Sequence, residues 1–229
     1  MRLSVIIPIL DEAETLPQTL GTLQALRSEG NEVIVVDGGS RDGSAQLAAG
    51  LADQILLAPR GRALQMNAGA RRARGECLLF LHADTLLPAG AAETIAAGLA
   101  ATGRAWGRFD VRLSGRPWPL RLVETLMNLR SRLTGIATGD QALFVKRAVF
   151  EKLGGFPEIP LMEDIALCRR LKRISPPLCL RQRVITSSRR WESNGIWRTI
   201  ALMWHLRLAY FLGADPADLA RRYRAGKRS

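Results

Sequence analysis

Polar side chains, most of them acidic, follow three apolar runs of this 229-residue chain, at the point where each run ends. They are Asp11 and Glu12 after LSVIIPIL, Asp37 at the end of EVIVVD, and His82 and Asp84 after ECLLFL. Ligands of parallel α/β sheets bind beyond the carboxyl ends of the strands, so these side chains are candidates to face a ligand. Carboxylate oxygens suit Mg²⁺ or Mn²⁺, and Mg²⁺ usually binds through one or two carboxylates together with substrate phosphates.

Each of these acids also has a plainer interpretation. Asp84 could ligate a divalent metal, or it could be an ordinary loop carboxylate. Asp37 precedes the turn-forming stretch GGSRDGS. It could accept hydrogen bonds from a base or a ribose, or it could only stabilise the turn.

A further acidic pair, Glu163 and Asp164, stands at the start of an expected helix. The helix dipole favours an ionised carboxylate there, as a general base requires. The alternative is an acid that only complements the dipole of the first turn.

Apolar runs alternate with helical spacings through the first half of the chain, which predicts an α/β fold with a mainly parallel sheet flanked by helices. We expect strands at 3–10, 32–37, 54–58, 76–81, 108–113 and 142–147. We expect helices at 16–26, capped by Thr15, and at 45–51, 62–74, 89–101, 119–133, 148–153 and 165–174. No internal repeat or linker divides the chain. The sequence therefore predicts one main domain, 1–190, with a basic helical extension, 191–229, packed on it.

The net charge of +12 points to an anionic partner, such as nucleic acid, nucleotide phosphates or an acidic membrane surface. Aromatic residues make up only 6% and no nucleic-acid-binding motif is present, so we expect no nucleic-acid partner. The three scattered cysteines favour a reducing cytoplasm. The apolar start is too short for a signal peptide, and charges interrupt the best candidate for a membrane span, 196–213.

The segments SVIIPILDEAETL, VIVVDGGSRDGS, LLFLHADTLLP, GDQALFVKRAVFEKLGGF and EDIALCRRL occur in this order over 3–171. The series resembles glycosyltransferase family 2, whose members are inverting nucleotide-sugar transferases with the GT-A fold. The resemblance implies an enzyme that moves a sugar from a nucleotide donor to a hydroxyl acceptor with a divalent metal.

The resemblance also implies roles for residues that match the family motifs. The nucleotide pocket would be lined by Pro8, Asp11, Glu12 and Asp37, with Asp84 on the metal. Asp164 of the Glu163-Asp164 motif would be the catalytic base, and Gly139, Asp140 and Gln141 would lie on the acceptor side. His82 replaces the first acid of the Asp-x-Asp motif, so its ribose contact would come from an imidazole. Independently of the resemblance, Arg60 and Arg62 could lie over the diphosphate at the start of a helix.

The stretch SSRRWESNG resembles a motif of processive synthases in the same family, which would put Arg190 and Trp191 on the acceptor side. The alternative is a basic surface loop with a packing tryptophan. The whole layout also resembles a short bacterial subgroup of family 2 associated with radical-SAM and selenium-linked genes.

The extension is basic and aromatic-rich, a composition typical of a segment in a membrane interface. The alternative is a helix packed on the catalytic domain. Many relatives use lipid-linked acceptors, so we expect a cytoplasmic protein that can associate peripherally with anionic membrane. Two other functions stay open, a basic nucleic-acid-binding module and a nucleotide-sugar-binding protein without transferase activity.

Overall fold

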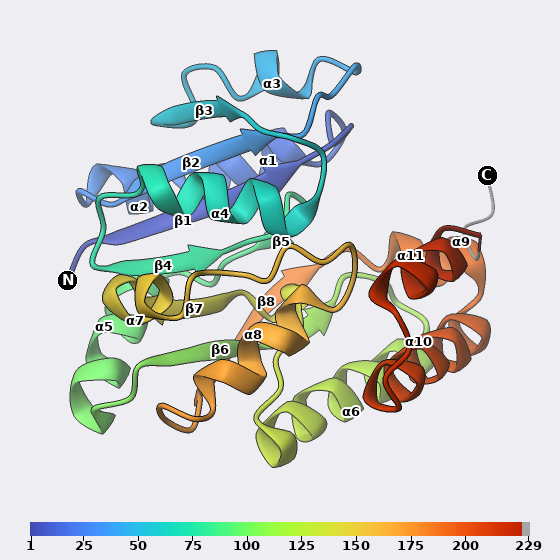
Figure 1. Ribbon diagram of the computed structural model, residues 1–229. Helices are drawn as coiled ribbons and strands as arrows, with labels where there is room; N and C mark the ends of the chain where they lie inside the picture. The colour runs from blue at the N-terminus through green and yellow to red at the C-terminus, as the bar shows by residue number, and fades with distance from the viewer. Residues whose placement is uncertain (226–229) are drawn as a thin grey trace.

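A computed structural model, which describes residues 1–225, places eight strands in one sheet (Figure 1). The order across the sheet is β3-β2-β1-β4-β7-β6-β8-β5. The strands are β1 (Leu3–Ile9), β2 (Glu32–Asp37), β3 (Gln54–Leu57), β4 (Cys77–Phe80), β5 (Thr85–Leu86), β6 (Trp106–Leu113), β7 (Leu143–Lys146) and β8 (Leu178–Thr186). The expected α/β class and all six expected strands are confirmed.

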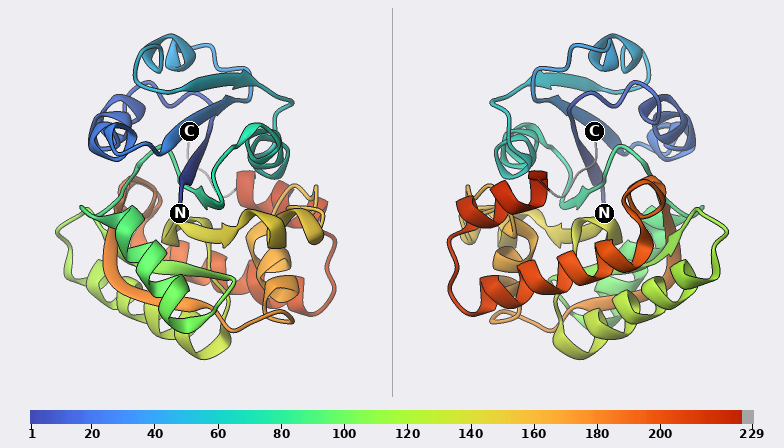
Figure 2. Two further views of the ribbon diagram at one scale, coloured as in Figure 1. Left: turned by 90° about the vertical axis from the view of Figure 1, so that its left-hand side faces the viewer. Right: turned by 90° about the vertical axis from the view of Figure 1, so that its right-hand side faces the viewer.

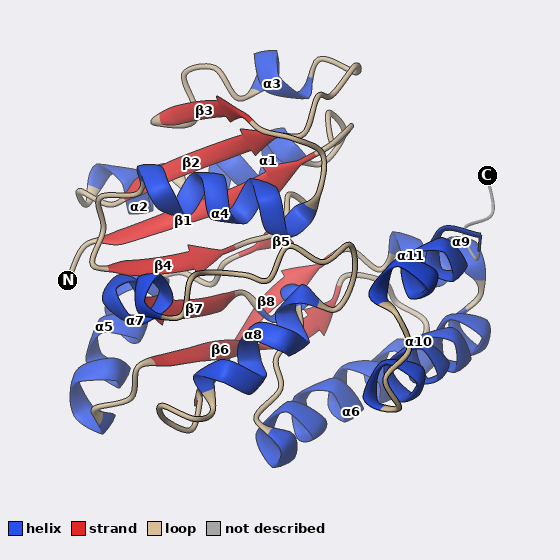
Figure 3. Cartoon of the chain, viewed as in Figure 1, coloured by secondary structure: helices blue, strands red, loops and turns tan. Residues whose placement is uncertain are grey.

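The first four strands run parallel, and helices cover both faces of the sheet (Figure 3). Successive residues of β1 point to opposite faces: Ile6 joins the apolar core that contains residues of α4 (Arg62–Arg72), whereas Val5 and Ile7 join the core beneath α1 (Leu16–Thr22). Burial on both faces explains why these strands are continuously apolar. α2 (Gln24–Ser28) and α3 (Ser44–Leu47) complete this half, whereas α5 (Ala91–Thr102) packs against β8 in the other half.

The second half of the sheet is mixed. β7 pairs antiparallel with β4 and β6, β8 runs parallel to β6, and β5 pairs antiparallel with β8. Two strands were not expected from the sequence, β5 and β8. The helices of this half are α6 (Trp118–Thr134), the 3₁₀ turn η1 (Gly139–Gln141), α7 (Arg147–Lys152) and α8 (Glu163–Leu171).

Thr15 is the N-cap residue of α1, but the expected capping bond of its side chain is absent. Its hydroxyl donates instead to Glu12 Oε2 at 3.0 Å. The helix expected over 16–26 is also two helices, which meet at Leu23.

The C-terminal segment forms three helices, α9 (Arg189–Asn194), α10 (Ile196–Phe211) and α11 (Pro216–Ala225). Leu206 of α10 and Leu219 of α11 are fully buried in the apolar core shared with α8. The extension therefore packs on the main sheet domain. Among residues 1–225, no helix combines the length and apolarity needed to cross a bilayer.

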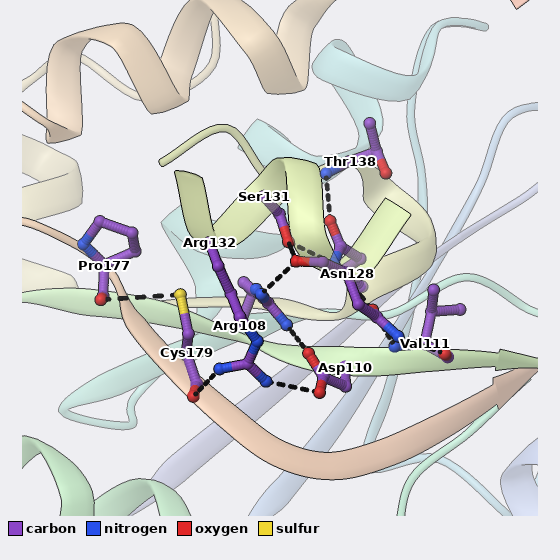
Figure 4. Close-up of polar contacts among 10 residues, drawn as sticks. Arg108, Asp110, Val111, Asn128, Ser131, Arg132, Thr138, Pro177 and Cys179 are labelled. Carbon is purple, nitrogen blue, oxygen red and sulfur yellow. Dashed lines mark hydrogen bonds and ion pairs between the residues drawn. The ribbon is translucent and has the colours of Figure 1, made fainter. Parts of the chain in front are cut away.

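A buried polar network fixes α6 and η1 against β6 (Figure 4). Arg108 is 1% exposed and pairs with Asp110, which also pairs with Arg132 of α6. The Asn128 side chain joins α6 to the backbone of Val111. Its Oδ1 accepts from Val111 N–H at 2.8 Å, and its Nδ2 donates to Val111 O at 3.0 Å. Since η1 follows α6 directly, this network helps to set the position of η1.

We expect Asp110→Ala to lower the free energy of unfolding by about 3–5 kcal/mol, because it leaves the buried Arg108 without its carboxylate. Urea unfolding would measure the loss. The control is Glu151→Ala, which removes an exposed carboxylate 4.0 Å from Arg147 and should cost less than about 1 kcal/mol. Equal small losses in both variants would contradict a structural role for the network.

Candidate functional site

Asp164 lies in the first turn of α8, and two backbone N–H groups hold its carboxylate. Ile165 N–H donates to Oδ1 at 2.7 Å and Gly139 N–H donates to Oδ2 at 3.0 Å. The turn before α8 needs Met162 in the left-handed region, at φ 69°. The carboxylate is thus fixed between α8 and η1.

Burial and the neighbouring charge of Glu163 raise the pKa of Asp164 to about 6, against the opposing effects of its two backbone hydrogen bonds and Arg62. The sequence predicts that the helix dipole keeps this carboxylate ionised at neutral pH. Burial acts against the ionised form and is the largest effect on the pKa of Asp164. With a pKa near 6, the carboxylate is still mainly ionised at neutral pH and can accept a proton.

Arg62 begins α4 and faces the same acids. Its Nη1 lies 3.6 Å from Oε1 of Glu163, whose side chain is buried. Burial opposes the charged form of Arg62, but the charges of Glu163, Asp164, Asp140 and Asp84 outweigh it and raise its pKa. Arg62, His82, Gly139, Glu163 and Asp164 line one pocket together with Met66, Phe80, Leu143 and Phe156.

His82 and Asp140 form a second pair at this pocket. His82 Nδ1 lies 3.2 Å from Asp140 Oδ1. Burial raises the pKa of Asp140, but the hydrogen bond and charge of His82, with Arg62 and Arg190, lower it further than burial raises it. The other ring nitrogen of His82, Nε2, is buried and has no hydrogen-bond partner among residues 1–225.

Gly139 is required here because the His82 ring lies against it. A Cβ on Gly139 would come within 2.2 Å of His82 Nε2 and 2.6 Å of Cε1. We expect Gly139→Ala to displace the imidazole or the backbone N–H that holds Asp164, and to reduce the activity of this site by on the order of 10²-fold, as misplacement of reacting groups by about 1 Å does.

The control for this prediction is Gly21→Ala, since a Cβ on Gly21 meets nothing within 4 Å. Steady-state rates and thermal unfolding of both variants would check it. A Gly139→Ala variant as active as Gly21→Ala would show that the close packing of His82 has no catalytic consequence.

Asp84 lies at the end of the loop after β4, close to Glu12. Burial raises the pKa of Glu12, the Thr15 hydrogen bond lowers it, and the charge of Asp84 raises it again. Arg189 of α9 approaches the same carboxylate, with Nη2 3.8 Å from Glu12 Oε2. The carboxylate oxygens of Asp84 suit a hard divalent cation whose other ligands would come from substrate phosphates and water. Within residues 1–225, no group of three or more His, Cys, Asp or Glu side chains could hold a metal by itself.

The ends of β1 and β2 form a second, more open pocket, lined by Leu10, Asp11, Gly38, Gly39, Arg41 and Arg60. Asp11 takes a positive φ of 54°, and its Oδ1 accepts from Arg41 N–H at 2.8 Å. Asp37 Oδ1 accepts from the backbone and the hydroxyl of Ser40 at 2.9 and 2.6 Å, so this oxygen also stabilises the turn. Pro8 lies in β1 beyond Ile6, the last residue that pairs with β4.

Two expected acceptor-side residues are placed elsewhere. Gln141 is fully buried, and its amide nitrogen donates to Ser131 Oγ at 3.0 Å, so it anchors η1 to α6. The ring of Trp191 packs against the small apolar cluster of Leu113, Leu120 and Val123. Trp191 therefore behaves as the alternative interpretation expects, as a tryptophan that packs on the domain. Asp140 and Gly139 do lie at the pocket.

Sequence reasoning named Arg190 but missed its contact with α11, and it missed Arg130 altogether. The Arg190 guanidinium lies 3.7 Å from the ring centre of Tyr223 in α11 and donates to its hydroxyl. Burial lowers the pKa of Arg190 to about 10, although Asp140 opposes this. Arg130 of α6 has buried Nε and Nη2 atoms without a hydrogen-bond partner among residues 1–225, and it feels the charges of Asp164 and Asp140. Nothing in the sequence around either arginine indicates these long-range placements.

Comparisons with known proteins agree with this geometry. A family described as Glycosyl transferase family 2 matches residues 4–154. The chain is 33% identical over 159 residues to "Undecaprenyl-phosphate 4-deoxy-4-formamido-L-arabinose transferase" of Pseudomonas paraeruginosa (strain DSM 24068 / PA7), covering 62% of this chain and 45% of the relative. It thus spans less than half the length of that curated relative.

Solved structures share the fold. "Crystal structure of S. aureus TarS 1-349 in complex with UDP" superposes with a TM-score of 0.68 at 18% identity, covering 88% of this chain and 65% of that one. "Mannosyltransferase PcManGT from Pyrobaculum calidifontis in complex with GDP-Man and Mn2+" gives a TM-score of 0.66 at 21% identity, covering 97% and 68%.

Proposed function

This chain belongs to glycosyltransferase family 2 and has the GT-A fold, and from that premise we propose that it transfers a sugar from a nucleoside-diphosphate donor to a hydroxyl acceptor with inversion. The observation that carries the proposal is the part-buried Asp164 carboxylate, which two backbone N–H groups fix at one pocket, while a second, more open pocket lies at the ends of β1 and β2.

Asp164 is the proposed general base. The acceptor oxygen attacks the anomeric carbon, the bond from that carbon to the diphosphate oxygen breaks, and the acceptor proton passes to Asp164. Attack opposite the leaving group inverts the anomeric centre. The pKa of about 6 suits this step, because a base works best when its pKa lies near the working pH. Glu163 is itself engaged with Arg62, so we assign it to positioning.

The site fits a divalent cation held by Asp84 and by donor phosphates. When bound, Mn²⁺ or Mg²⁺ neutralises charge that develops on the diphosphate leaving group. Glu12 interacts electrostatically with Asp84 and His82, and Arg62 supplies a positive charge that interacts with Asp84. The mannosyltransferase neighbour is described with GDP-Man and Mn²⁺, which supports this choice of cofactor.

The open pocket between β1 and β2 is proposed to take the nucleotide. Asp11 would supply an acceptor in this pocket, and Arg41 and Arg60 would supply positive charge. Asp37 ends β2 directly before Gly38 of the pocket and would supply a second acceptor. Another neighbour is described in complex with UDP. The acceptor would enter from the side of Asp140 and Arg190.

The curated relatives carry undecaprenyl-phosphate in their names, so we include a lipid-linked acceptor in the proposal. Three further predictions from the sequence are kept as proposals. They are a cytoplasmic location with peripheral attachment to anionic membrane, the division of the chain into 1–190 and 191–229, and membership of the selenium-associated subgroup.

Thermal unfolding with a panel of UDP-, GDP- and dTDP-sugars, with Mn²⁺ and with EDTA, tests the proposed function. We expect one nucleotide class to raise the unfolding temperature, with a larger shift in Mn²⁺. If no nucleotide stabilises the protein in either condition, the proposed donor class is wrong.

A further inference from the structure

The outward side of α6 is apolar along its whole length. Trp118, Leu122, Leu126, Leu129 and Leu133 recur at spacings of four, four, three and four, which places them on one face of a helix. All five are exposed, with Trp118 at 70% and Leu133 at 77%. The opposite side of α6 is the one that packs on β6, through Leu120 and Val123. The outward stripe therefore adds nothing to the core.

The outward side of α10 has the same character. Trp197, Trp204, Leu208 and Phe211 recur at spacings of seven, four and three. Trp204 is 68% exposed and Leu208 is 60% exposed. The buried side of α10 is formed by other residues, among them Thr199 and Leu206. A helix with apolar residues both inside and outside has more apolar surface than its own packing uses.

The two stripes join into one surface, here called the α6–α10 face. It consists of Trp118, Leu122, Leu126, Leu129, Leu133, Trp197, Trp204, Leu208 and Phe211. α6 and α10 contact each other, and the rings of Trp118 and Trp197 meet edge to face with centres 6.3 Å apart. The helices lie next to each other in Figure 1 and in the right-hand view of Figure 2. Monomeric soluble proteins rarely expose so many apolar side chains together.

The exposed charges of α6 and α10 themselves are of one sign, although the exposed carboxylate of Glu192 in α9 lies against Gly115, just before α6. Within α6 the one carboxylate is Glu124, which is buried and bonds to Leu113 N–H at 3.0 Å. α10 contains no Asp or Glu. Arg116, Arg198 and Arg207 belong to or adjoin these helices. A second copy of this chain would bring arginines against arginines without exposed carboxylates of the same helices to pair them, whereas an anionic surface would pair with them.

We propose that the α6–α10 face docks the protein onto an anionic lipid bilayer, with the three exposed tryptophans in the interface and the arginines on lipid phosphates. Aromatic side chains and basic side chains are both favoured at that depth. The proposal deepens the proposed function by giving the membrane contact a definite surface, and it rests on the fold and exposure of the two helices and not on transferase activity.

The same surface connects to the catalytic pocket through α6. Ser131, on the inner side of this helix, holds Gln141 of η1, and η1 supplies the Gly139 N–H that binds Asp164. Arg130 follows the outward Leu129 directly and lies close enough to Asp164 for their charges to interact. Docking through α6 would therefore bring the acceptor side of the pocket near the lipid headgroups.

Co-sedimentation tests the proposal without any substrate. The protein is mixed with vesicles of equal phosphatidylglycerol and phosphatidylcholine, or of phosphatidylcholine alone, at low and high salt. We expect binding to the anionic vesicles that weakens with salt. Each arginine near an anionic surface adds about 1 kcal/mol, so Arg198→Gln with Arg207→Gln should weaken binding on the order of tenfold.

Replacing Trp118, Trp197 and Trp204 together by Gln should weaken binding on the order of a hundredfold or more, because their apolar surface supplies the non-ionic part of the affinity. The matched control is Leu57→Gln, which removes a side chain that is 79% exposed on β3, at the opposite edge of the sheet. Tryptophan emission gives a second measurement, since lipid contact should shift it to shorter wavelength in the wild type and in Leu57→Gln.

Three results would overturn the proposal. They are absence of binding to anionic vesicles at low salt, equal loss of binding in Leu57→Gln, and a stable dimer in light scattering that the tryptophan variant dissociates. The last would assign the α6–α10 face to a second copy of the chain. Failure of the nucleotide panel would leave these measurements unaffected, so the two proposals can fail separately.

Discussion

Asp164→Asn is expected to lower the rate of sugar transfer by on the order of 10²-fold or more, with donor affinity retained. The amide keeps the shape of the side chain and can still accept the N–H of Gly139 through its oxygen. It cannot take the proton from the acceptor hydroxyl. Rate and donor affinity, measured separately, would distinguish loss of the base from loss of binding.

The pH dependence gives the same assignment a second test. Since the base must be ionised, the wild-type rate should fall as the pH drops through about 6, the pKa of Asp164. Asp164→Asn should lose this limb of the profile, whereas Asp218→Asn, a change of an exposed carboxylate on α11, should keep both rate and profile. An unchanged rate in Asp164→Asn would remove Asp164 from the mechanism.

Asp84→Ala is expected to abolish the part of nucleotide binding that depends on Mn²⁺. Asp84 is the residue we assign to the metal, and the described chain offers no cluster of three ligands that could replace it. The change also removes a charge that repels Glu12, so the protein without metal should be no less stable. Titration with the nucleotide in Mn²⁺ and in EDTA would measure the effect.

Asp218→Ala serves as the control for Asp84→Ala, because it removes one exposed carboxylate of α11 that pairs only with Arg221 among the contacts of the described residues. We expect it to bind nucleotide as the wild type does in both conditions. Metal-dependent binding that survives in Asp84→Ala would contradict the metal assignment, whereas binding lost equally with and without Mn²⁺ would indicate a structural defect.

The parallel half of the sheet could be predicted because its strands are buried on both faces and are therefore apolar throughout. β8 could not. Arg181, Gln182 and Arg183 stand in its middle, all exposed, and its pairing with β6 shifts register between Phe109 and Asp110. Three successive polar residues break the alternation of apolar and polar residues that marks a strand. The segment is a strand because it pairs with β6, and the local sequence pattern does not indicate this.

The acids of the site could be predicted because parallel strands deliver their carboxyl ends to one edge. The directions in which the remaining side chains point could not be predicted from the sequence. Gln141 lies next to Asp140, yet it turns into α6 while Asp140 pairs with His82. The contact of Arg190 with Tyr223 joins positions 33 residues apart across two helices. Spacing along the chain carries no information about contacts of this kind.

The pKa of Asp164 shows the limit of the helix-dipole argument. A position in the first turn of a helix favours the ionised form by a modest amount. Here burial and the adjacent Glu163 act in the other direction and prevail. Sequence predicted the position of the acid, but only the packing of η1 and α4 around it gives the environment that sets its proton affinity.

The central claim is sugar transfer with Asp164 as the base, and the most direct test is to measure release of nucleoside diphosphate. The donor is the one that the thermal panel selects, and release is measured in Mn²⁺ and in EDTA for the wild type and for Asp164→Asn. The account predicts release by the wild type in Mn²⁺ that falls, in EDTA or in the variant, to background. Release that is the same in both proteins, or no release with any donor and acceptor extract, would contradict it.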